Sequence, residues 1–401
     1  MYITDWELRK LKNLVCFSKG SGYSKKDLVY EGNPIILYGN LYTNYSTIIN
    51  DVRTYTNKKS SSIISTGRDV IVPASGETPE DIARASFVEV PGIIYGGDLN
   101  VLTVDTNILY PSYLAFLLSN GKIKTRLSRL AQGKSIVHLH NSDLEKISFL
   151  LPTYHEQKRI SNILLNLEES ITLQQQQLDL YTKLKKGLLQ KLFPKDGEKV
   201  PEIRFADFTG NWEQCKLSQV IESIHKGTNL LGKESNDGIP LIKMGNIQRG
   251  YYDLSKLQYL DSKDNVESKS IIHYGDFLIN TRNTLELVGK GATWFGKSNE
   301  YAFNSNISLI TFSEINTIFF NYLYNTQYSI YKINSISVGT TSVAAIYPKD
   351  LCTISFIIPI LQEQESIGKF LKKLDKLITL QQDKIKKVNL LKKYLLQKLF
   401  I

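Results

Sequence analysis

Side chains that could do chemistry are sparse in this sequence and form no recognisable active site. There is no Gly-x-x-x-x-Gly-Lys-Ser/Thr phosphate loop, no Asp/Asn-Pro-Pro-Tyr run and no strand–Gly-x-Gly-x-x-Gly–helix pattern. His138 and His140 are either two metal ligands on one face of a strand or a pair of loop residues. Without a third ligand nearby in sequence, the loop interpretation is favoured. An Asp-x-Lys run at 261–263 is too short to define a nuclease, and His155 fits the start of a helix. The sequence therefore offers no convincing active site.

Charge and composition favour a polyanionic partner. The 401 residues carry a formal net charge of +10 and 23 tyrosines, which suits a nucleic-acid surface. A merely basic protein would have the same charge, and tyrosine is also a strand residue. Cys16, Cys215 and Cys352 are too far apart to suggest a disulfide framework or a zinc knuckle. No apolar run reaches the roughly 18 residues of a membrane span and no signal peptide opens the chain, so a cytoplasmic location is expected.

A duplicated segment must position these scattered groups. Residues 151–193 return without a gap as residues 358–400, which is 207 positions later. The first copy contains Pro152-x-x-x-Glu156-Gln157-x-x-Ile160 and the second contains Pro359-x-x-x-Glu363-Gln364-x-x-Ile367. This period is far longer than the roughly 20 to 50 residues of a solenoid unit. It indicates the duplication of a whole domain.

Each copy of the segment is predicted to form one long helix. Apolar residues recur every three or four positions over about five heptads, which is typical of a coiled coil. Lys185 and Lys392 occupy equivalent positions in the two copies, and each interrupts this apolar seam. Gln174 and Gln381 occupy another pair of equivalent seam positions and are interpreted as polar residues that fix the register of the two helices. At about 1.5 Å per residue, each helix would span on the order of 55 Å, longer than a small domain needs.

Further leucines lie partly off this seam. The candidates for a partner-binding surface are Leu165, Leu173, Leu180, Leu184 and Leu380. Extra apolar stripes favour the packing of additional helices from a partner, as in a four-helix bundle. The alternative is a thicker seam between the two helices of this chain.

The regions before the two helices repeat as well, as one frame with different loops. Trp6-Glu-x-x-Lys-Leu returns at Trp212, Gly39-Asn40 at Gly245-Asn246, and Asp69–Val72 at Asp276–Ile279. The predicted fold class is α+β, a pseudo-twofold internal repeat of two similar mixed α/β domains joined by two long helices with a coiled-coil pattern. The expected boundaries are 1–150 and 212–357 for the domains, 151–193 and 358–401 for the helices, and 194–211 for the linker. Strands are expected at 34–38 and 69–72, and a short helix at 111–118.

This ordered and doubled set of motifs resembles the specificity (S) subunit of type I restriction–modification systems. The lead-in Pro201-Glu-Ile-Arg-Phe205-x-x-Phe208 and the run Gly339-Thr-Thr-Ser342 add to the likeness, which covers nearly the whole chain. One departure is that the residues before Trp6 contain no matching lead-in.

The resemblance implies two target-recognition domains that each read one half of a split DNA sequence. It also implies that the two long helices form an antiparallel coiled coil, which serves as a spacer. It implies double-stranded DNA, two methyltransferase (M) subunits and motor–nuclease (R) subunits as partners, and no membrane. Adenine methylation and ATP-dependent cleavage, together with S-adenosylmethionine, ATP and magnesium, are then expected on those partners and no cofactor on this chain.

Lysine and arginine on phosphates supply affinity in such a protein, whereas contacts to base edges supply specificity. The loops after the shared landmarks are therefore the predicted DNA contacts. In the first domain they are Lys19, Tyr23, Lys25, Lys26, Asn40, Tyr42, Asn44, Ser75, Lys134 and Ser135. In the second they are Lys226, Asn246, Gln248, Arg249, Tyr251, Arg282, Asn283, Thr340 and Thr341. Amides can read adenine and arginine can read guanine.

Two other classes of protein stay open from the sequence. One is a non-enzymatic coiled-coil scaffold with two protein-binding heads, which would show no salt-dependent DNA binding. The other is a nuclease or modification enzyme, whose activity the purified chain alone would show. Neither class explains why the two frames match while their loops differ.

Overall fold

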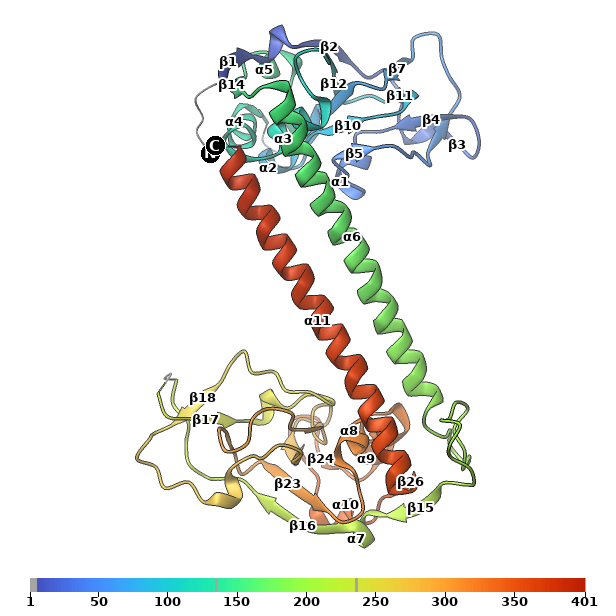
Figure 1. Cartoon of the computed structure of the whole chain (residues 1–401), viewed down its shortest axis with the longest axis vertical. Helices are drawn as coiled ribbons and strands as arrows, with labels where there is room; N and C mark the ends of the chain where they lie inside the picture. Colours follow the sequence, from blue (N-terminus) through green and yellow to red (C-terminus); the bar gives the residue numbers. More distant parts are fainter. Residues whose placement is uncertain (1–5, 134–135, 235–236, 401) are drawn as a thin grey trace. The chain divides into compact units, whose positions relative to one another are not determined.

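The computed structural model describes residues 6–133, 136–234 and 237–400. The chain forms two compact units. Unit 1 comprises residues 1–175 and 383–401, and unit 2 comprises residues 176–382. Each unit thus contains the first part of one long helix and the last part of the other (Figure 1).

Unit 1 contains two five-stranded sheets and two short strand pairs. The first sheet has the order β2 (Val15–Lys19), β12 (Leu99–Val104), β8 (Asp69–Pro73), β10 (Ser86–Val88) and β5 (Ile48–Ile49). The second has the order β3 (Leu28–Val29), β6 (Tyr55–Thr56), β4 (Asn33–Ile36), β11 (Pro91–Tyr95) and β7 (Ile63–Thr66). The pairs are β1 (Glu7–Lys10) with β14 (Ser148–Leu151) and β9 (Ser75–Gly76) with β13 (Val137–His138). The short helices are α1 (Asn40–Thr43), α2 (Pro79–Ile82), α3 (Pro111–Ser119), α4 (Gly121–Leu130) and α5 (Asn141–Leu144).

The core of unit 1 lies between α3 and the first sheet. Every residue of α3 and of β8 is buried, since the helix packs against β8 and β10. Apolar side chains on all sides suit a helix that has no solvent face. The predicted strands near 34–38 and 69–72 and the predicted helix at 111–118 are confirmed.

Unit 2 repeats this plan with shorter sheets. Its four-stranded sheet has the order β16 (Ile221–Lys226), β23 (Ile307–Phe312), β19 (Phe277–Asn280) and β21 (Gly291–Thr293). Its two three-stranded sheets are β18 (Gln258–Leu260), β17 (Ile239–Ile242) and β22 (Ala302–Phe303), and β20 (Arg282–Asn283), β25 (Ala344–Ala345) and β24 (Val338–Gly339). β15 (Glu213–Lys216) pairs with β26 (Ser355–Ile358), and the helices are α7 (Leu217–Val220), α8 (Thr317–Tyr324), α9 (Gln327–Ser335) and α10 (Pro348–Leu351).

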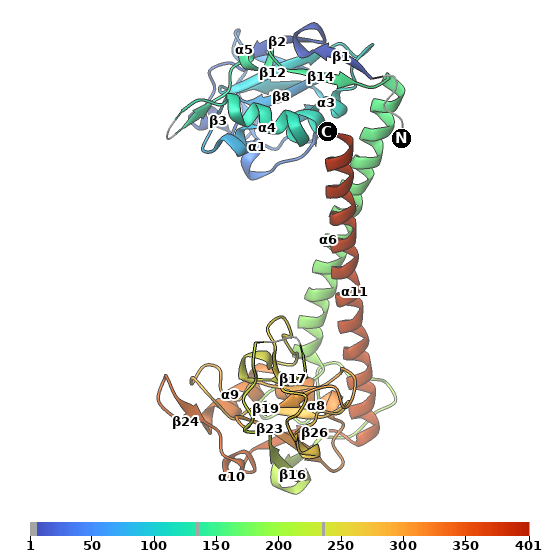
Figure 2. The same ribbon diagram turned by 90° about the vertical axis from the view of Figure 1, so that its left-hand side faces the viewer.

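The two duplicated segments form the long helices α6 (Tyr154–Lys191, 38 residues) and α11 (Leu361–Leu399, 39 residues). Both are unbroken in two views at right angles (Figures 1 and 2). In unit 2, Lys185 pairs with Asp375 and Gln177 with Gln381. Because residue numbers rise along one helix as they fall along the other, the helices pair antiparallel in this unit.

The end of each helix inserts an aromatic ring into a unit core. In unit 1, Phe400 is buried with its ring centroid 5.6 Å from that of Tyr113. In unit 2, Phe193 is buried, and its ring centroid lies 5.6 Å from that of Phe319. Each core therefore contains residues from the start of one long helix and from the end of the other.

Candidate nucleic-acid interface

Two predicted DNA-contact segments of unit 2 lie side by side. Strand β20 carries Arg282 and Asn283 and pairs with β25, which pairs in turn with β24. The turn between β24 and β25 carries Thr340 and Thr341, and its backbone is held by a 3.2 Å hydrogen bond from Leu285 N to Thr341 O. Arg282, Thr340 and Thr341 are exposed. Folding thus brings an exposed arginine and two exposed hydroxyls into one three-stranded sheet, in which β20 and β24 flank β25. The sequence separates these side chains by more than fifty positions.

Unit 1 has an equivalent strand pair. Strand β9 occupies the place of β20, and β13 occupies that of β25. Gly133 and Gly339 precede β13 and β25 in the chain and have φ of 142° and 144°, a backbone conformation that side chains disfavour. The predicted contacts Lys134 and Ser135 lie outside the described residues.

Ser75 lies on β9 with its side chain largely buried. Its hydroxyl is 3.2 Å from Nδ1 of His138, whose ring stacks on His140 with centroids 6.2 Å apart. The hydroxyl of Tyr42 donates to the carbonyl of Ser75 at 2.9 Å. Burial raises the pKa of Tyr42, which keeps its phenol neutral. Ser75 and Tyr42 thus come together, although the sequence separates them.

Arg84 was not singled out from the sequence, because no local pattern marks it. Its guanidinium lies 5.3 Å from the ring centroid of Tyr42 and 5.4 Å from that of Tyr45. It also donates to the carbonyl of Leu41 at 3.0 Å and pairs with Asp81. Arg84 therefore positions the tyrosines beside the strand pair of unit 1.

The asparagines of the repeated Gly-Asn landmark hold the frame of each unit. Oδ1 of Asn40 accepts from Leu37 N at 2.9 Å, and Oδ1 of Asn246 accepts from Lys243 N at 2.8 Å. Asn246 is buried, and its Nδ2 donates to two further carbonyls. This amide is already hydrogen-bonded within its own loop, so its geometry suits turn formation better than base reading. Asn44, at the end of α1, is exposed.

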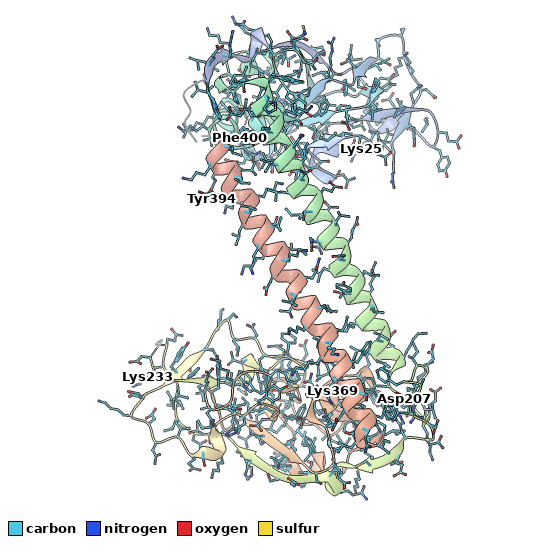
Figure 3. The ribbon with its side chains drawn as sticks, viewed as in Figure 1. Lys25, Asp207, Lys233, Lys369, Tyr394 and Phe400 are labelled. Carbon is cyan, nitrogen blue, oxygen red and sulfur yellow. The ribbon has the colours of Figure 1, made fainter. Side chains whose placement is uncertain are left out.

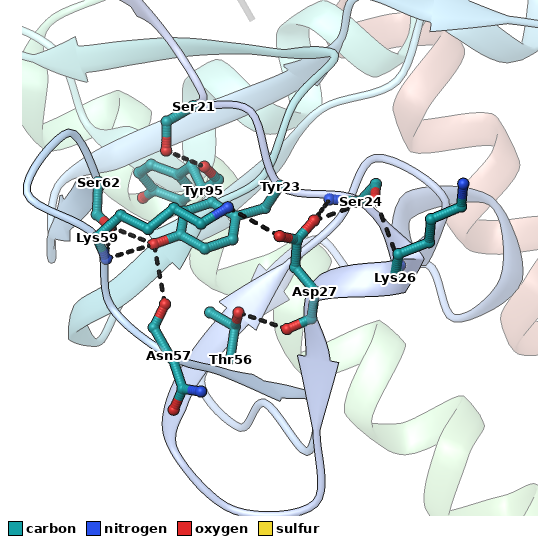
Figure 4. A network of polar contacts seen from close by, with 10 residues as sticks. All are labelled: Ser21, Tyr23, Ser24, Lys26, Asp27, Thr56, Asn57, Lys59, Ser62 and Tyr95. Carbon is teal, nitrogen blue, oxygen red and sulfur yellow. Dashed lines mark hydrogen bonds and ion pairs between the residues drawn. The ribbon is translucent and has the colours of Figure 1, made fainter.

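Tyr23 lies inside a polar network in unit 1 (Figure 4). Its hydroxyl is 2.5 Å from Ser62 Oγ and accepts from Lys59 N at 2.7 Å. The ammonium of Lys59 lies 4.3 Å from the Tyr23 ring centroid and donates to Asp27 at 2.8 Å. That hydrogen bond is the largest cause that lowers the pKa of Asp27 to about 2. Tyr23 thus braces the segment that carries the exposed Lys25 and Lys26.

Lys19 and Lys226 occupy equivalent places in the two units. Each is the last residue of its strand, β2 or β16, and each is exposed. An exposed ammonium at a strand end is accessible to a phosphate group.

The remaining predicted contacts lie on the loop after Asn246. Tyr251 is exposed, whereas Gln248 accepts from Lys290 Nζ at 2.7 Å. Arg249 is half-buried and lines a cavity of about 660 Å³ with residues of α8 and α11. Its Nη1 is shielded from solvent and has no hydrogen-bond partner among the described residues. Burial lowers the pKa of its guanidinium. Arg249 points inward here, unlike Arg282.

Four of the five predicted partner-binding leucines are exposed on the long helices. They are Leu173, Leu180, Leu184 and Leu380. Leu165 instead packs against the core of unit 1. These four side chains leave apolar surface open on α6 and α11.

The Gln of the repeated Pro-x-x-x-Glu-Gln motif fastens helix α6 to unit 1. Gln157 is fully buried; its Oε1 accepts from Tyr110 N at 2.8 Å. Its Nε2 donates to the carbonyls of Ile108 and Pro152 at 3.0 and 2.9 Å. All three partners are backbone groups.

Unit 2 repeats this arrangement. Gln364 accepts from Asn316 N at 3.0 Å and donates to the carbonyls of Glu314 and Pro359 at 3.4 and 2.9 Å. The repeated glutamine was visible in the sequence, but its role required the backbone groups that face it.

Lysines in the seam form equivalent ion pairs between the helices. Lys392 lies 2.7 Å from Glu168 in unit 1, and Lys185 lies 2.5 Å from Asp375 in unit 2. Glu168 also accepts from Thr47 at 3.0 Å, and Asp375 accepts from Tyr322. The predicted breaks in the seam are therefore sites where acidic residues join both helices to their unit.

Among the described residues, no group of three or more His, Cys, Asp or Glu side chains could hold a metal ion. None of the helices in that part of the chain is long and apolar enough to cross a membrane.

Comparison with known proteins shows the family to which this chain belongs. The family model of the type I restriction modification DNA specificity domain matches residues 3–180 and again residues 209–390. The chain belongs to this family and contains its domain twice, as the repeated motifs predicted.

Two curated relatives come from Methanocaldococcus jannaschii. The type I restriction enzyme MjaVIII specificity subunit is 24% identical over 97% of this chain and 90% of its own length. The putative type I restriction enzyme MjaX specificity subunit is 24% identical over 97% of this chain and 91% of its own length.

A crystal structure of a type I restriction-modification S subunit from M. genitalium has the same fold. It matches with a TM-score of 0.61 and 16% identity, over 99% of this chain and 96% of that one. The predicted α+β fold with two similar mixed units and long helices is confirmed.

Proposed function

We propose that this chain is the specificity subunit of a type I restriction–modification complex and reads a bipartite DNA target. The observation that carries the proposal is the doubled frame with unlike reading edges, at β9–β13 and at β20–β25–β24. Residues 1–150 and 212–357 would be the two target-recognition domains. Residues 151–193 and 358–401 would be the spacer helices, and 194–211 the linker.

A spacer made of two long helices suits two half-sites. With 38 residues, α6 is about 57 Å long at 1.5 Å per residue, whereas one turn of duplex is about 34 Å. Helices of this length can hold two reading domains about one duplex turn apart, with base pairs of any sequence between the half-sites.

Base reading in the second domain is assigned to Arg282, Asn283, Thr340 and Thr341, with Gln248, Arg249 and Tyr251 beside them. Arg282 supports this best because its guanidinium is exposed and can donate two hydrogen bonds to guanine. In the first domain, base reading is assigned to Ser75, on the strand equivalent to β20, together with Tyr42, Lys134 and Ser135. The exposed Lys19, Lys25, Lys26 and Lys226 would contact phosphates.

Catalysis is assigned to partner subunits. Two methyltransferase subunits would pack on the exposed leucines of the helices, and motor–nuclease subunits would join the full complex. S-adenosylmethionine, ATP and magnesium would bind those partners, in the cytoplasm. The competing proposal is a scaffold whose two heads bind proteins.

The test is a single-molecule methylation map of DNA from cells that express this chain with its methyltransferase subunit. A split motif methylated on opposite strands of its two halves is expected. A soluble complex that produces no new methylated motif would contradict the proposal and favour the scaffold.

A further inference from the structure

Helix α4 of unit 1 carries a stripe of positive charge on its exposed side. Lys122, Arg126 and Arg129 are exposed, and their spacing of four and three residues places them on one face of the helix. Leu127, on another face, is buried in the core. The three exposed side chains are here called the α4 stripe. At about 1.5 Å per residue, the stripe is about 10 Å long.

The charge of the α4 stripe is not neutralised by acidic side chains. The helix itself contains no Asp or Glu. Within the part of the chain that the structure describes, none of the three cations forms an ion pair. Arg126 Nη2 donates to the carbonyl of Lys146 at 3.2 Å, but this acceptor is uncharged. The stripe therefore presents three unpaired positive charges to solvent.

This arrangement destabilises the helix that carries it. Like charges three and four residues apart repel each other, and Lys122 lies in the first turn, where the helix dipole disfavours a cation. An anionic partner would offset both effects. The phosphates of one DNA strand follow one another at about 3.4 Å along the duplex axis, so the stripe is as long as about three of them.

Both ends of α4 are held within unit 1. At its start, Lys122 N donates to the carbonyl of Phe400, which is labelled in Figure 3, at 3.4 Å. Just after its end, Gln132 and His138 of β13 exchange backbone hydrogen bonds of 3.0 and 2.7 Å. Helix α2 contacts α4, β9 and β13. The α4 stripe is thus fixed close to the strand pair that carries Ser75.

The equivalent helix of unit 2, α9, has no such stripe. The buried Leu127 of α4 corresponds to the buried Ile333 of α9, so the stripe positions correspond to Tyr328, Lys332 and Ser335. Lys332 is half-buried, and its Nζ donates to a backbone carbonyl at 2.8 Å and lies 4.3 Å from the ring centroid of Tyr328. The helix is therefore duplicated, but its positive stripe is present in unit 1 alone.

We propose that the α4 stripe binds DNA phosphates beside the half-site that unit 1 reads, so that the two units contact the DNA backbone unequally. This role rests on the proposed function and adds to it a contact that reads no sequence. Three features support it: the unpaired charges, the length of the stripe and its place next to β13. The stripe anchors unit 1 on any duplex, whereas Ser75 and its neighbours select the sequence.

The test compares the full chain with the triple variant Lys122→Gln, Arg126→Gln and Arg129→Gln in filter binding over a salt series. Each lost phosphate contact releases one counterion fewer, so the slope of log K against log salt should fall by about 0.9 per contact, or about 2.7 in all. At about 0.1 M salt the affinity should fall more than about tenfold, equally for target and random duplexes. Circular dichroism checks that the variant is folded.

A matched control removes the same charge elsewhere and should leave the slope unchanged. Its three changes, each to Gln, are at exposed residues of α11, namely Lys376, Lys384 and Lys387. If the α4 triple variant also kept the steep slope of the unaltered chain, the α4 stripe would be wrong and the proposed function would stand. If the unaltered chain showed no salt-dependent DNA binding, both proposals would fail. Unchanged DNA binding with loss of a partner subunit would assign the stripe to an acidic protein surface and overturn the proposal.

Phosphate ethylation interference on the methylated target tests the unequal contact without altering the protein. Ethylated phosphates that block binding are expected to extend further beside one half-site than beside the other. These additional positions should disappear in the α4 triple variant. Equal interference beside the two half-sites would contradict the proposal.

Discussion

Single residues fasten the duplicated frame, and their roles differ from what their types suggest. Gln157 and Gln364 look like exposed helix residues in the sequence, yet each satisfies three backbone groups of its unit. A buried amide that matches three fixed partners tolerates little change, because unsatisfied backbone groups are costly. This explains why the motif occurs in both copies.

Replacing Gln157 with alanine should destabilise unit 1. Three backbone partners lose their hydrogen bonds, so the free energy of unfolding should fall by about 3 kcal/mol. Urea denaturation followed by circular dichroism measures this. Gln176→Ala, at an exposed position of the same helix, should change stability by less than about 0.5 kcal/mol. Equal effects of the two changes would refute the role of Gln157.

Acid should weaken the network of Figure 4 through Asp27. Its pKa is lowered in the folded chain from 3.8 to about 2, mainly by the hydrogen bond from Lys59. The stability from this carboxylate is therefore fully present above pH 4 and is lost as the pH falls through 2. Asp27→Asn should show a smaller drop in urea midpoint between pH 5 and pH 2. An unchanged drop would exclude Asp27 as its source.

Lys226→Ala should weaken binding to all DNA sequences alike. An ammonium that contacts a phosphate releases one counterion, so the slope of log K against log salt should fall by about 0.9. Filter binding to target and random duplexes over a salt series measures both quantities. Lys376→Ala, exposed on α11, is the control. A loss confined to the target sequence would instead assign Lys226 to base reading.

At the scale of elements, the two units share one arrangement of paired strands, but these strands carry different side chains in each unit. Strands β20 and β9 hold Arg282 and Ser75 at equivalent places, and the strands that pair with them, β25 and β13, each follow a glycine with positive φ, Gly339 or Gly133. A fixed frame with variable tips permits changes of target without changes of fold. The edges are therefore where sequence choice is expected to reside.

Arg282→Ala should relax the choice of base in one half of the methylated motif and leave the other half unchanged. The loss of a bidentate contact to guanine corresponds to about 1 to 3 kcal/mol of discrimination. Methylation mapping measures the motif directly, and Arg249→Ala is the informative comparison because Arg249 points inward. If only the Arg249→Ala variant changed the methylated motif, base reading would be assigned to the loop that contains Arg249 instead of to Arg282.

At the scale of the whole molecule, the long helices combine two tasks. Their seam lysines form ion pairs with acids that also contact the units, whereas leucines on other faces stay exposed. Since solvent-exposed leucines contribute little to folding, they are available for a partner.

The double change Leu173→Glu and Leu380→Glu should abolish co-purification of the methyltransferase subunit. Both side chains are more than half exposed, at 53% and 54%, so the helical content should be unchanged. Pull-down of a tagged chain together with circular dichroism measures the two effects. Gln176→Glu is the control for an added charge on the helix surface. Intact co-purification in the double variant would rule out the leucine surface.

The sequence by itself determined the duplication, the long helices and the family, because these depend on patterns that recur along the chain. Apolar spacing near 3.5 residues specifies a coiled-coil helix whatever surrounds it. The predictions for α3 and for β8 succeeded for the same local reason.

Only the tertiary structure decided which polar side chains are free to bind and which are used internally. Tyr23 looks like a candidate DNA contact in the sequence, but folding brings the backbone N–H of Lys59 and the hydroxyl of Ser62 to its own hydroxyl. Asn40 and Asn246 accept hydrogen bonds from backbone groups of their own loops. Arg282 and Thr340 belong to one sheet only because β20 and β24 both pair with β25. The availability of a polar group depends on its three-dimensional neighbours, and those neighbours are set by long-range strand pairing that local sequence does not encode.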